Sequence, residues 1–390
     1  MSVMSASANP PSASGTFRIF LCGDVMTGRG IDQILPHPCD PTLHEPYVLD
    51  ARRYVQLAEE VHGMIHWPVD ESYIWGDALE VCDRMGPDFR IVNLETAITT
   101  SDRYWPGKAI HYRMSPRNVG CLTAARIDCC ALANNHLLDW GSEGMLETLE
   151  TLRRFGIKAA GAGRDRSEAE SPATLELPGN GRVLVFSFGT PTSGIPLEWA
   201  ATDDRPGVHL LPDLSATTAR AVSQLVARHR CGGDIVVASI HWGGNWGYTI
   251  PGSQRQFARR LVDEAGVAVV HGHSSHHVQG IEVYRDRLIL YGCGDFLTDY
   301  EGIRGHEDFR PDLALMYFAD IETSWPGRLV RLQMAPLQSY RFRLRRATND
   351  DTLEISNTLN REGLSFGTRV RLDSHGMLEL QWGRAAPEQA

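Results

Sequence analysis

The feature that most constrains the fold of this chain is a series of short apolar runs separated by helix-forming segments. Runs such as "RVLVFSFG", "DIVVASIHWG" and "RLILYGCGDF" carry Val, Ile and Leu at neighbouring positions. Strands that are apolar on both faces are typical of sheets covered by helices. Segments 142–155, 214–229 and 253–265 lie between such runs and are predicted to be helical. The sequence therefore predicts an α/β fold.

The chain of 390 residues is predicted to have three parts. Residues 1–16 are rich in Ser, Ala and Pro and lack the features of a signal peptide, so we expect a disordered lead. Residues 17–346 are predicted to form one catalytic domain. Within it, residues 31–80 contain several prolines and a helix over 50–61, which predicts a lid-like insertion. Residues 347–390 are predicted to add a short helix, a terminal strand and a disordered end.

Composition argues against nucleic-acid and membrane partners. The net charge is −10, which disfavours non-specific electrostatic binding to phosphate backbones or anionic lipid. The densest basic run, "RFRLRR" at 341–346, alternates Arg with Phe and Leu and predicts a strand with one solvated face. No apolar stretch approaches the ~18 residues of a membrane span. The eight cysteines show no C-x-x-C spacing, so we expect reduced, buried thiols in a cytoplasmic protein.

Five of the predicted strands end in side chains that can bind a metal ion. Carboxyl ends of strands converge on one crevice in α/β sheets. Single residues of this kind more often cap helices or close turns, but five at five strand ends predict a divalent metal site, with Mn, Fe, Zn, Mg or Ca as candidate ions. These residues are Asp24, Asn93 with Glu95, Asn135 with His136, His241, and His271 with His273, His276 and His277.

Five ordered motifs carry a resemblance to a known family. "GDVMTGR", "NLETAIT", "ANNHLLDWG", "IHWG" and "GHSSHH" occur in this order between Phe17 and Tyr300. Together they resemble the CapA family, the branch of the calcineurin-like metallophosphoesterases named for poly-γ-glutamate capsule synthesis. The resemblance implies a sandwich of two mixed β-sheets flanked by helices, with one or two divalent ions at the strand ends.

The resemblance also implies a role for each matching residue. His136 resembles the histidine that acts as a general acid beside the metal, with Asp139 to orient it and Asp24 as a further candidate in proton transfer. His271 and His277 stand outside the matching positions, and Asn134 is expected only to cap the next helix. The implied metal ligands are Asp24, Glu95, Asn135, His241, His273 and His276.

Two departures from the family pattern bear on the number of ions. Classical members carry Asp-x-His in the first motif, whereas Met26 occupies the third position here. Their second motif supplies Asp, whereas Glu95 is the nearest carboxylate in this chain. These residues favour one firmly held metal ion, or an unequal pair, over a symmetric dinuclear site.

The favoured function is metal-dependent epimerisation of a peptide-type substrate. A metal ion that polarises a carbonyl makes the adjacent Cα–H acidic, so that one residue can remove the proton and another can return it. A CapA-like enzyme of this length also resembles the epimerases of lasso peptide biosynthesis, which invert the C-terminal residue of a ribosomal precursor. Arg29 is predicted to bind a carboxylate of a peptide or other small acidic substrate, and Trp242, Trp246 and Tyr248 to hold the peptide end.

Two alternatives remain open at this stage. One is metal-dependent phosphoester hydrolysis, although no Gly-rich phosphate loop is visible in the sequence. The other is an accessory role in poly-γ-glutamate capsule synthesis, although the chain shows neither an export signal nor a membrane anchor. Solvent deuterium at Cα would indicate epimerisation, and release of phosphate would indicate hydrolysis. The oligomeric state is not predicted.

Overall fold

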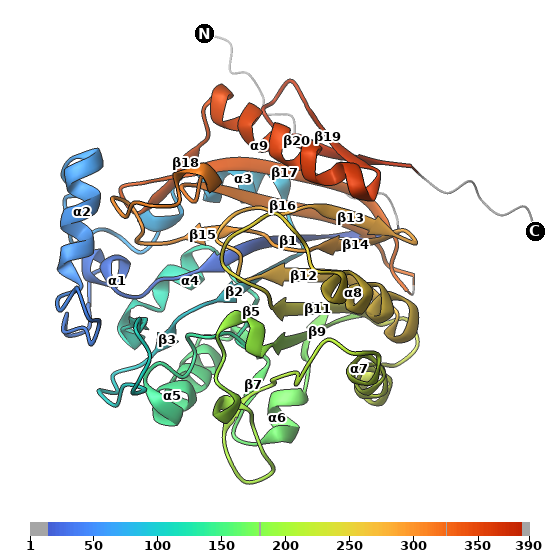
Figure 1. Cartoon of the computed structure of the whole chain (residues 1–390), viewed down its shortest axis with the longest axis horizontal. Helices are drawn as coiled ribbons and strands as arrows, with labels where there is room; N and C mark the ends of the chain where they lie inside the picture. The colour runs from blue at the N-terminus through green and yellow to red at the C-terminus, as the bar shows by residue number, and fades with distance from the viewer. Residues whose placement is uncertain (1–14, 179–180, 325, 384–390) are drawn as a thin grey trace, which may run out of the picture.

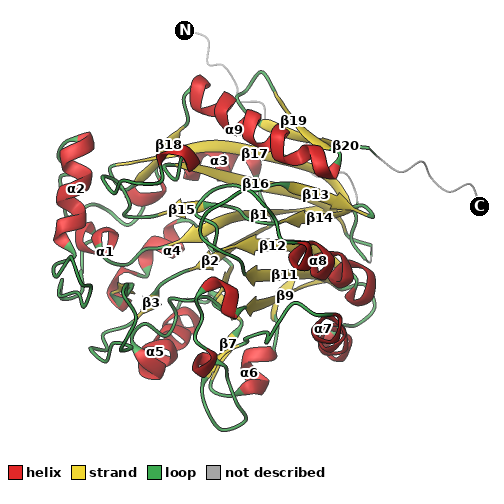
Figure 2. Ribbon diagram, viewed as in Figure 1, coloured by secondary structure: helices red, strands yellow, loops and turns green. Residues whose placement is uncertain are grey.

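The computed structural model describes residues 15–178, 181–324 and 326–383. Within these ranges the chain builds two large β-sheets that lie face to face, with helices on their outer surfaces (Figures 1 and 2). Each sheet contains both parallel and antiparallel pairs of strands. The prediction of an α/β sandwich of two mixed sheets flanked by helices is therefore confirmed.

The first sheet supplies the longer strands and the N-terminal part of the site. Its parallel half consists of β1, β2, β5 and β6, and its antiparallel half extends from β1 through β16 and β17. In spatial order the strands are β19 (Thr368–Leu372), β20 (Leu378–Trp382), β17 (Leu329–Tyr340), β16 (Leu313–Glu322), β1 (Thr16–Val25), β2 (Phe89–Leu94), β5 (Cys129–Ala131) and β6 (Lys158–Ala160), with β15 (Asp295–Leu297) beside β1 and β18 (Arg343–Arg346) beside β17.

The second sheet has a parallel centre and antiparallel edges. Strands β9, β11, β12 and β14 run parallel, whereas β13 and β8 pair antiparallel at the two edges. The spatial order is β13 (Ile281–Tyr284), β14 (Arg287–Leu290), β12 (Val267–His273), β11 (Ile235–His241), β9 (Arg182–Gly189) and β8 (Ala173–Glu176). Two short ribbons complete the strands, β3 (Ala97–Ile98) with β4 (Arg113–Met114) and β7 (Ala162–Gly163) with β10 (Gly207–Val208).

Alternation along the strands creates one core between the sheets and one outside each of them. On β1, Ile19 and Leu21 contribute to the core between the sheets, whereas Phe20 and Cys22 pack outward under helices. The outer core of the second sheet is covered by α7 and α8. The helices are α1 (Gly30–Ile34), α2 (Arg52–His62), α3 (Asp77–Met85), α4 (Gly120–Ala124), α5 (Gly141–Arg154), α6 (Arg166–Glu170), α7 (Ala216–His229), α8 (Gly252–Ala265) and α9 (Asn349–Gly363).

Segments outside the sheets differ in part from the sequence predictions. In the 31–80 insertion, Tyr54 and Trp75 are buried in the outer core of the first sheet, so the insertion forms a packed wall; its movement as a lid remains a prediction. The C-terminal extension has the helix α9 and two strands, β19 and β20, where one strand was expected, because they form a hairpin that adds to β17. The predicted disordered ends lie outside the described residues, apart from Gly15, Thr16 and Gly383, and Thr16 already belongs to β1. No described helix is long and apolar enough to cross a membrane.

Candidate metal centre

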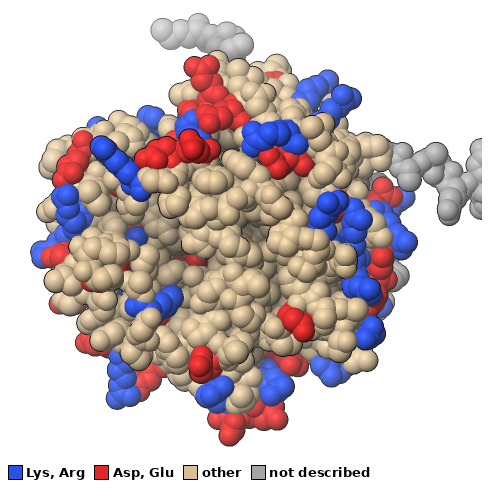
Figure 3. All heavy atoms as spheres, in the orientation of Figure 1, with Lys and Arg blue, Asp and Glu red and all other residues tan. Residues whose placement is uncertain are grey.

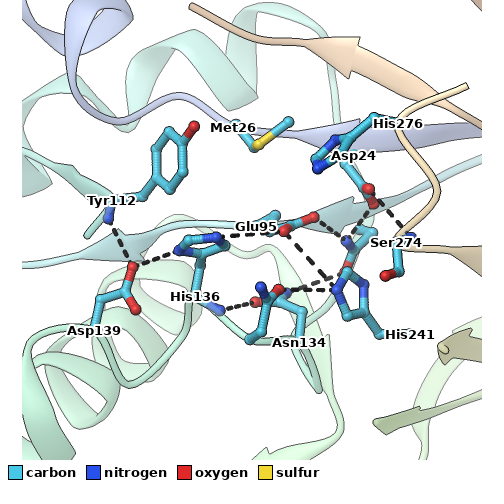
Figure 4. A network of polar contacts seen from close by, with 12 residues as sticks. Asp24, Met26, Glu95, Tyr112, Asn134, His136, Asp139, His241, Ser274 and His276 are labelled. Atoms are coloured by element: carbon cyan, nitrogen blue, oxygen red, sulfur yellow. Dashed lines mark hydrogen bonds and ion pairs between the residues drawn. The ribbon is translucent and has the colours of Figure 1, made fainter. Parts of the chain in front are cut away.

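Carboxyl ends of strands from both sheets meet at one place. In the first sheet, Asp24 on β1 lies in register with Asn93 on β2. In the second sheet, His241 on β11 lies in register with His273 on β12. The two sheets are joined here by the backbone N–H of Ser274, which donates to Asp24 Oδ2 at 3.2 Å (Figure 4). The molecular surface shows a hollow on the viewed face in which acidic atoms are visible (Figure 3).

Asp24, His241 and His273 form a cluster that could hold a metal ion. One ligand atom from each of these buried residues lies within 4.8 Å of the others. The Nδ1 atoms of His241 and His273 are 2.8 Å apart, and His273 Nδ1 is 3.9 Å from Asp24 Oδ1. Burial lowers the pKa of both imidazoles well below the ordinary value, so they are neutral at pH 7. Neutral imidazole is the form that binds metal ions.

The predicted amide and second carboxylate lie beside this cluster. Asn135 Oδ1 is 2.9 Å from His241 Nε2, and Glu95 Oε1 is 3.9 Å from the same nitrogen. The Asn93 side-chain amide donates to Asp24 Oδ1 at 2.7 Å and to Glu95 Oε2 at 3.3 Å. Asn93 thus holds the two carboxyls in place. The structure brings together the predicted ligands from all five strand ends.

Buried carboxyls give the centre an affinity for cations. Burial and the nearby Asp295 raise the pKa of Asp24 to about 7. Burial, followed by the charge of Asp24, raises the pKa of Glu95 well above its ordinary value. Asp295 Oδ2 is buried and has no hydrogen-bond partner among the described residues. A divalent cation would supply the charge that these oxygens lack, and a set of carboxylate, amide and imidazole donors suits a hard or borderline metal.

Met26 changes one side of the centre, as the sequence predicted. Its side chain is fully buried, and its sulfur accepts a weak hydrogen bond from the Tyr300 hydroxyl at 3.6 Å. A thioether that packs against a tyrosine does not replace an imidazole as a ligand for a hard ion. The structure therefore fits a cofactor that is a divalent ion, while its identity and number stay predictions.

His136 is held by an aspartate and a lysine. Its Nδ1 is 2.6 Å from Asp139 Oδ2 and 3.0 Å from Lys108 Nζ, while its Nε2 is 3.7 Å from Glu95 Oε1. Lys108 also bonds the Asp139 carboxylate and the Asn135 carbonyl, and the backbone N–H of Tyr112 donates to Asp139 Oδ2. Burial lowers the pKa of His136 to about 4, which leaves this imidazole neutral at pH 7.

His276 forms a second histidine–aspartate pair beside the cluster. Its Nδ1 is 2.8 Å from Asp295 Oδ1, and the ring of Trp246 lies with its centroid 5.2 Å away. Burial lowers the pKa of His276, but the Asp295 carboxylate offsets this and the net pKa is raised. In Figure 4, Glu95 lies between His136 and His276. The centre therefore has one imidazole that favours the neutral form and one that favours the protonated form.

The two other histidines of this region are structural. His271 Nε2 is 2.7 Å from the Cys22 carbonyl, and its Nδ1 is 3.1 Å from Ser239 Oγ. His277 accepts a hydrogen bond from the Gly247 backbone N–H at Nε2. Both rings are therefore bonded within the protein, and His277 fixes the loop that follows β11.

Two of the predicted substrate-binding residues are corrected by the structure. Trp242 is 2% exposed and donates from Nε1 to the Tyr291 carbonyl, because strand alternation directs it away from the site and under α8. Arg29 is 3% exposed, and its guanidinium already binds Asp299 and Glu45. Neither side chain presents a surface to a substrate.

Trp246 and Tyr248, which were predicted to hold the peptide end, lie close to the metal centre. Both are half-buried, in the loop between β11 and α8. Trp246 stacks on His306 with ring centroids 3.9 Å apart, and Tyr248 packs edge-on against His277 at 4.6 Å. This aromatic surface adjoins His276, so the prediction that these residues contact a substrate remains a prediction consistent with their position.

Three residues of the site were missed from the sequence or given another role. Asp295 follows "GCG" as Asp24 follows "LCG", and this repeated "CGD" was an available signal. Lys108 lies in an irregular loop that matches no motif. The one available signal was that lysine is rare in this chain, which has two lysines, Lys108 and Lys158. Asn134 was expected to cap a helix, but its amide donates to Asn93 Oδ1 and the Leu94 carbonyl. It therefore braces the loop that carries Asn135.

Comparisons with known proteins identify the family of this chain. Residues 18–300, which include every predicted metal ligand, match the family described as bacterial capsule synthesis protein PGA_cap. A probable polyglutamine synthesis accessory protein of Mycobacterium tuberculosis is 47% identical over 363 residues, which cover 93% of this chain and 95% of that protein. The PGA biosynthesis protein CapA of Bacillus subtilis is 30% identical over 213 residues, which cover 54% of this chain and 53% of that protein.

A solved phosphatase from Mycoplasma pneumoniae is more distant. It covers 83% of this chain and 94% of its own length, with a TM-score of 0.45 and 12% sequence identity. A likeness at this level carries no conclusion about fold or activity. The family match, in contrast, spans most of the chain and its whole metal centre. This protein therefore belongs to the PGA_cap family of bacterial capsule synthesis proteins.

Proposed function

We propose that this protein is a metal-dependent enzyme that hydrolyses amide bonds in an acidic, glutamate-type polymer, as an accessory to polymer synthesis. The observation that carries the reaction is the pair of histidine–aspartate contacts, His136 with Asp139 and His276 with Asp295, beside the Asp24, His241 and His273 cluster. The polymer class rests on the names of the relatives, which are polyglutamine synthesis accessory protein and PGA biosynthesis protein. These names support the accessory alternative better than the lasso peptide epimerase that the sequence favoured.

The residues of the chain divide the proton transfers between them. A divalent cation held by Asp24, His241 and His273 would polarise a substrate carbonyl and make water more acidic. His136 is neutral at pH 7, so it can accept the proton of the attacking water at Nε2, while Asp139 stabilises the ring after it gains the charge. This differs from the general-acid role that the family resemblance implied.

His276 completes the reaction at the leaving group. Its pKa is raised by Asp295, so it can hold a proton and deliver it to the departing amine. The neighbouring Trp246 ring provides an apolar surface that limits the access of water to this side. Amide hydrolysis needs one base and one acid, and the two histidines satisfy this requirement.

Epimerisation at Cα is the second candidate, and one observation favours it. Inversion of a stereocentre needs a base on one face of the carbon and an acid on the other. The centre offers two such groups, because His136 lies beside Glu95 and His276 beside Asp295. A lasso peptide precursor or a polymer of glutamate could each supply an acidic Cα–H beside a polarised carbonyl.

The test uses purified protein loaded with Mn²⁺, Zn²⁺ or Mg²⁺ and a γ-glutamyl oligomer in D₂O. We expect new amine groups to appear, without deuterium at Cα. The variant His136→Gln should lose turnover by about 100-fold or more, the usual contribution of a general base, while it retains metal. Mass spectrometry measures the deuterium, an amine reagent measures hydrolysis, and metal analysis measures occupancy.

His375→Gln serves as the control, since His375 is exposed on a distant turn and should leave turnover unchanged. Deuterium at Cα without new amines would establish epimerisation in place of hydrolysis. Phosphate release from p-nitrophenyl phosphate at a higher rate than amide cleavage would instead identify a phosphoesterase. Full activity of His136→Gln and His276→Gln would rule out both mechanisms.

A further inference from the structure

A groove of about 590 Å³ lies between residues 64–73 and the turn that joins β17 to β18. Tyr73 and Tyr340 form part of its wall, and Met64 and Ile65 provide apolar surface. The remaining wall includes Arg341, Arg343 and Arg345, the arginines of the basic run that alternates with apolar residues in the sequence. The groove is therefore a basic and aromatic channel outside the metal centre.

Strand alternation places Arg343 and Arg345 on one face of β18, and Arg341 lies in the turn before this strand. Phe342 and Leu344 are 1% and 0% exposed, whereas the three arginines are half-buried and face the groove. Alternate residues of an extended strand are ~7 Å apart. Arg343 and Arg345 thus lie on one face of β18, as expected from the sequence for a strand with one solvated face, and Arg341 lines the same groove from the turn before it.

The guanidinium groups are held in ways that leave their charge available. Arg345 lies over the Tyr340 ring at 3.9 Å and otherwise bonds the Gln338 amide oxygen. Arg341 Nε donates to the His62 carbonyl. Among the described residues, neither of these arginines has a carboxylate within ion-pair distance, and Arg343 has only Asp77 at 4.0 Å.

The turn that carries Arg341 is strained and locked. Arg341 and Phe342 both have φ of 56°, a left-handed conformation that is unfavourable for residues other than glycine. Glu301 holds the turn by accepting hydrogen bonds from the backbone N–H groups of both residues, at 2.8 and 2.6 Å. An arginine is thus kept at a turn position where glycine or asparagine would be less strained.

We propose that this groove binds an acidic polypeptide chain by pairing its carboxylates with Arg341, Arg343 and Arg345. A guanidinium stacked on an aromatic ring still directs its N–H groups outward, where they can bind carboxylates. Two acidic residues also line the groove: Asp70 bonds Ser72, and Asp77 accepts the backbone N–H of Arg346 and lies 4.0 Å from Arg343. Arg341 and Arg345 keep charge that no described carboxylate pairs. Tyrosine rings and the apolar side chains would contact the backbone and methylene groups of the bound chain.

The groove is connected to the metal centre by two consecutive residues. Glu301 locks the groove turn, while the ring of Tyr300 packs against His276 at 5.5 Å and its hydroxyl bonds Tyr112. In Figure 1, the β17–β18 end and α2 lie on the side toward which the strands of the second sheet point. A polymer held by the arginines would extend toward the centre, an inference that rests on the proposed glutamate-type substrate.

The experiment measures binding of a fluorescein-labelled γ-glutamate oligomer by fluorescence anisotropy. We expect Arg343→Gln/Arg345→Gln to weaken the Kd by about tenfold or more, because charge-assisted hydrogen bonds are lost. Turnover of a γ-glutamyl dipeptide, too short to span both sites, should stay at the wild-type rate. Added salt should weaken binding to the wild type more than to the double variant.

The matched control is Arg369→Gln/Arg371→Gln, which removes two exposed arginines at the same spacing on β19 and should bind as the wild type does. Equal binding by both double variants, or tighter binding of a DNA oligonucleotide, would overturn the proposal. Asp24→Asn should lose turnover and still bind the oligomer. Wild-type turnover by Asp24→Asn would contradict only the proposed reaction, whereas unchanged binding by Arg343→Gln/Arg345→Gln would contradict only the groove. If the double variant melts early, the single Arg345→Gln variant provides the same test.

Discussion

Asp24, Glu95 and Asp295 are carboxyls buried within reach of one another. Asp24 and Asp295 belong to parallel strands and are partners in register, so their charges lie side by side. Burial and the repulsion from Asp295 are the causes of the raised pKa of Asp24. At the scale of single residues, the centre is therefore built to be completed by a cation.

Asp295→Asn should weaken metal binding although the carboxyl is not one of the residues predicted from the sequence. Asp295 orients His276 and leaves Oδ2 directed at no described partner. We expect the metal affinity to fall by about 10–100-fold, as for other residues that support metal ligands. Isothermal titration calorimetry would measure it, with the exposed Asp308→Asn as the control. An unchanged affinity would place Asp295 outside the centre.

Arg29 is a structural residue, and its replacement should lower the free energy of unfolding. Its guanidinium binds Asp299 and Glu45 and stacks on Tyr54 at 3.9 Å, all away from solvent. Arg29→Met would leave two buried carboxylates without their cation, at a cost of about 3–5 kcal/mol in the free energy of unfolding. Urea unfolding would measure the loss, and Arg153→Met, on the exposed face of α5, should change little. A change below about 1 kcal/mol would contradict the assignment.

At the scale of elements, the close contact of β1 with the chain before β15 positions the centre. A Cβ atom on Gly23 would lie 1.6 Å from the Gly294 carbonyl oxygen, and the Asp24 backbone N–H donates to the same oxygen at 3.0 Å. Both glycines belong to the repeated "CGD" that delivers the paired aspartates. The absence of a side chain at Gly23 thus permits the approach.

Gly23→Ala should therefore separate these two segments. We expect a loss of about 1–3 kcal/mol or more in the free energy of unfolding, together with weaker metal binding, because the backbone must shift to admit the methyl group. Thermal melting and metal titration would measure both effects. Gly232→Ala is the matched control, since no atom lies within 4 Å of the added Cβ and its φ is not in the left-handed region. Wild-type behaviour of Gly23→Ala would show that the two segments can separate without cost.

At the scale of the whole molecule, metal affinity and stability should respond to pH in opposite directions. Asp24 must lose its proton to bind a metal ion, so the affinity should fall about tenfold per pH unit below pH 7 and level off above it. In the metal-free protein the raised pKa means that the native state keeps a proton that the unfolded state loses. The contribution of Asp24 to the free energy of unfolding should therefore decrease as the pH rises from about 4 to about 7.

Calorimetry over this range measures the affinity, and urea unfolding in a chelator measures the stability. Asp24→Asn should reduce the pH dependence of both quantities, because the amide does not titrate and the other groups of the centre, such as Glu95, still do. Parallel curves for the wild type and this variant would show that another group sets the dependence. Positive and negative side chains are mixed on the viewed surface (Figure 3). We therefore expect the charges within the metal centre, and not a broad surface field, to determine the pH dependence of the metal affinity.

Much of the fold could be read from the sequence because strand and helix patterns are local. Continuous apolar runs indicated doubly covered strands, and the alternation in "RFRLRR" is confirmed by buried Phe342 and Leu344. The prediction for Trp242 was wrong, although the same alternation places it on the face of Ile240 and opposite His241. The error came from treating a strand residue as part of the loop that follows it.

The sequence by itself determined which strands end in candidate metal ligands, since Asp24, Glu95, Asn135, His241 and His273 each follow an apolar run. Only the tertiary structure decided what surrounds them, because Asp295, Lys108 and the partners of Arg29 come from distant segments. Arg29 and Asp299 are 270 residues apart, and no local pattern records that contact. Strand periodicity is a property of neighbours in the chain, whereas burial, repulsion between carboxyls and ion pairing depend on how the two sheets pack.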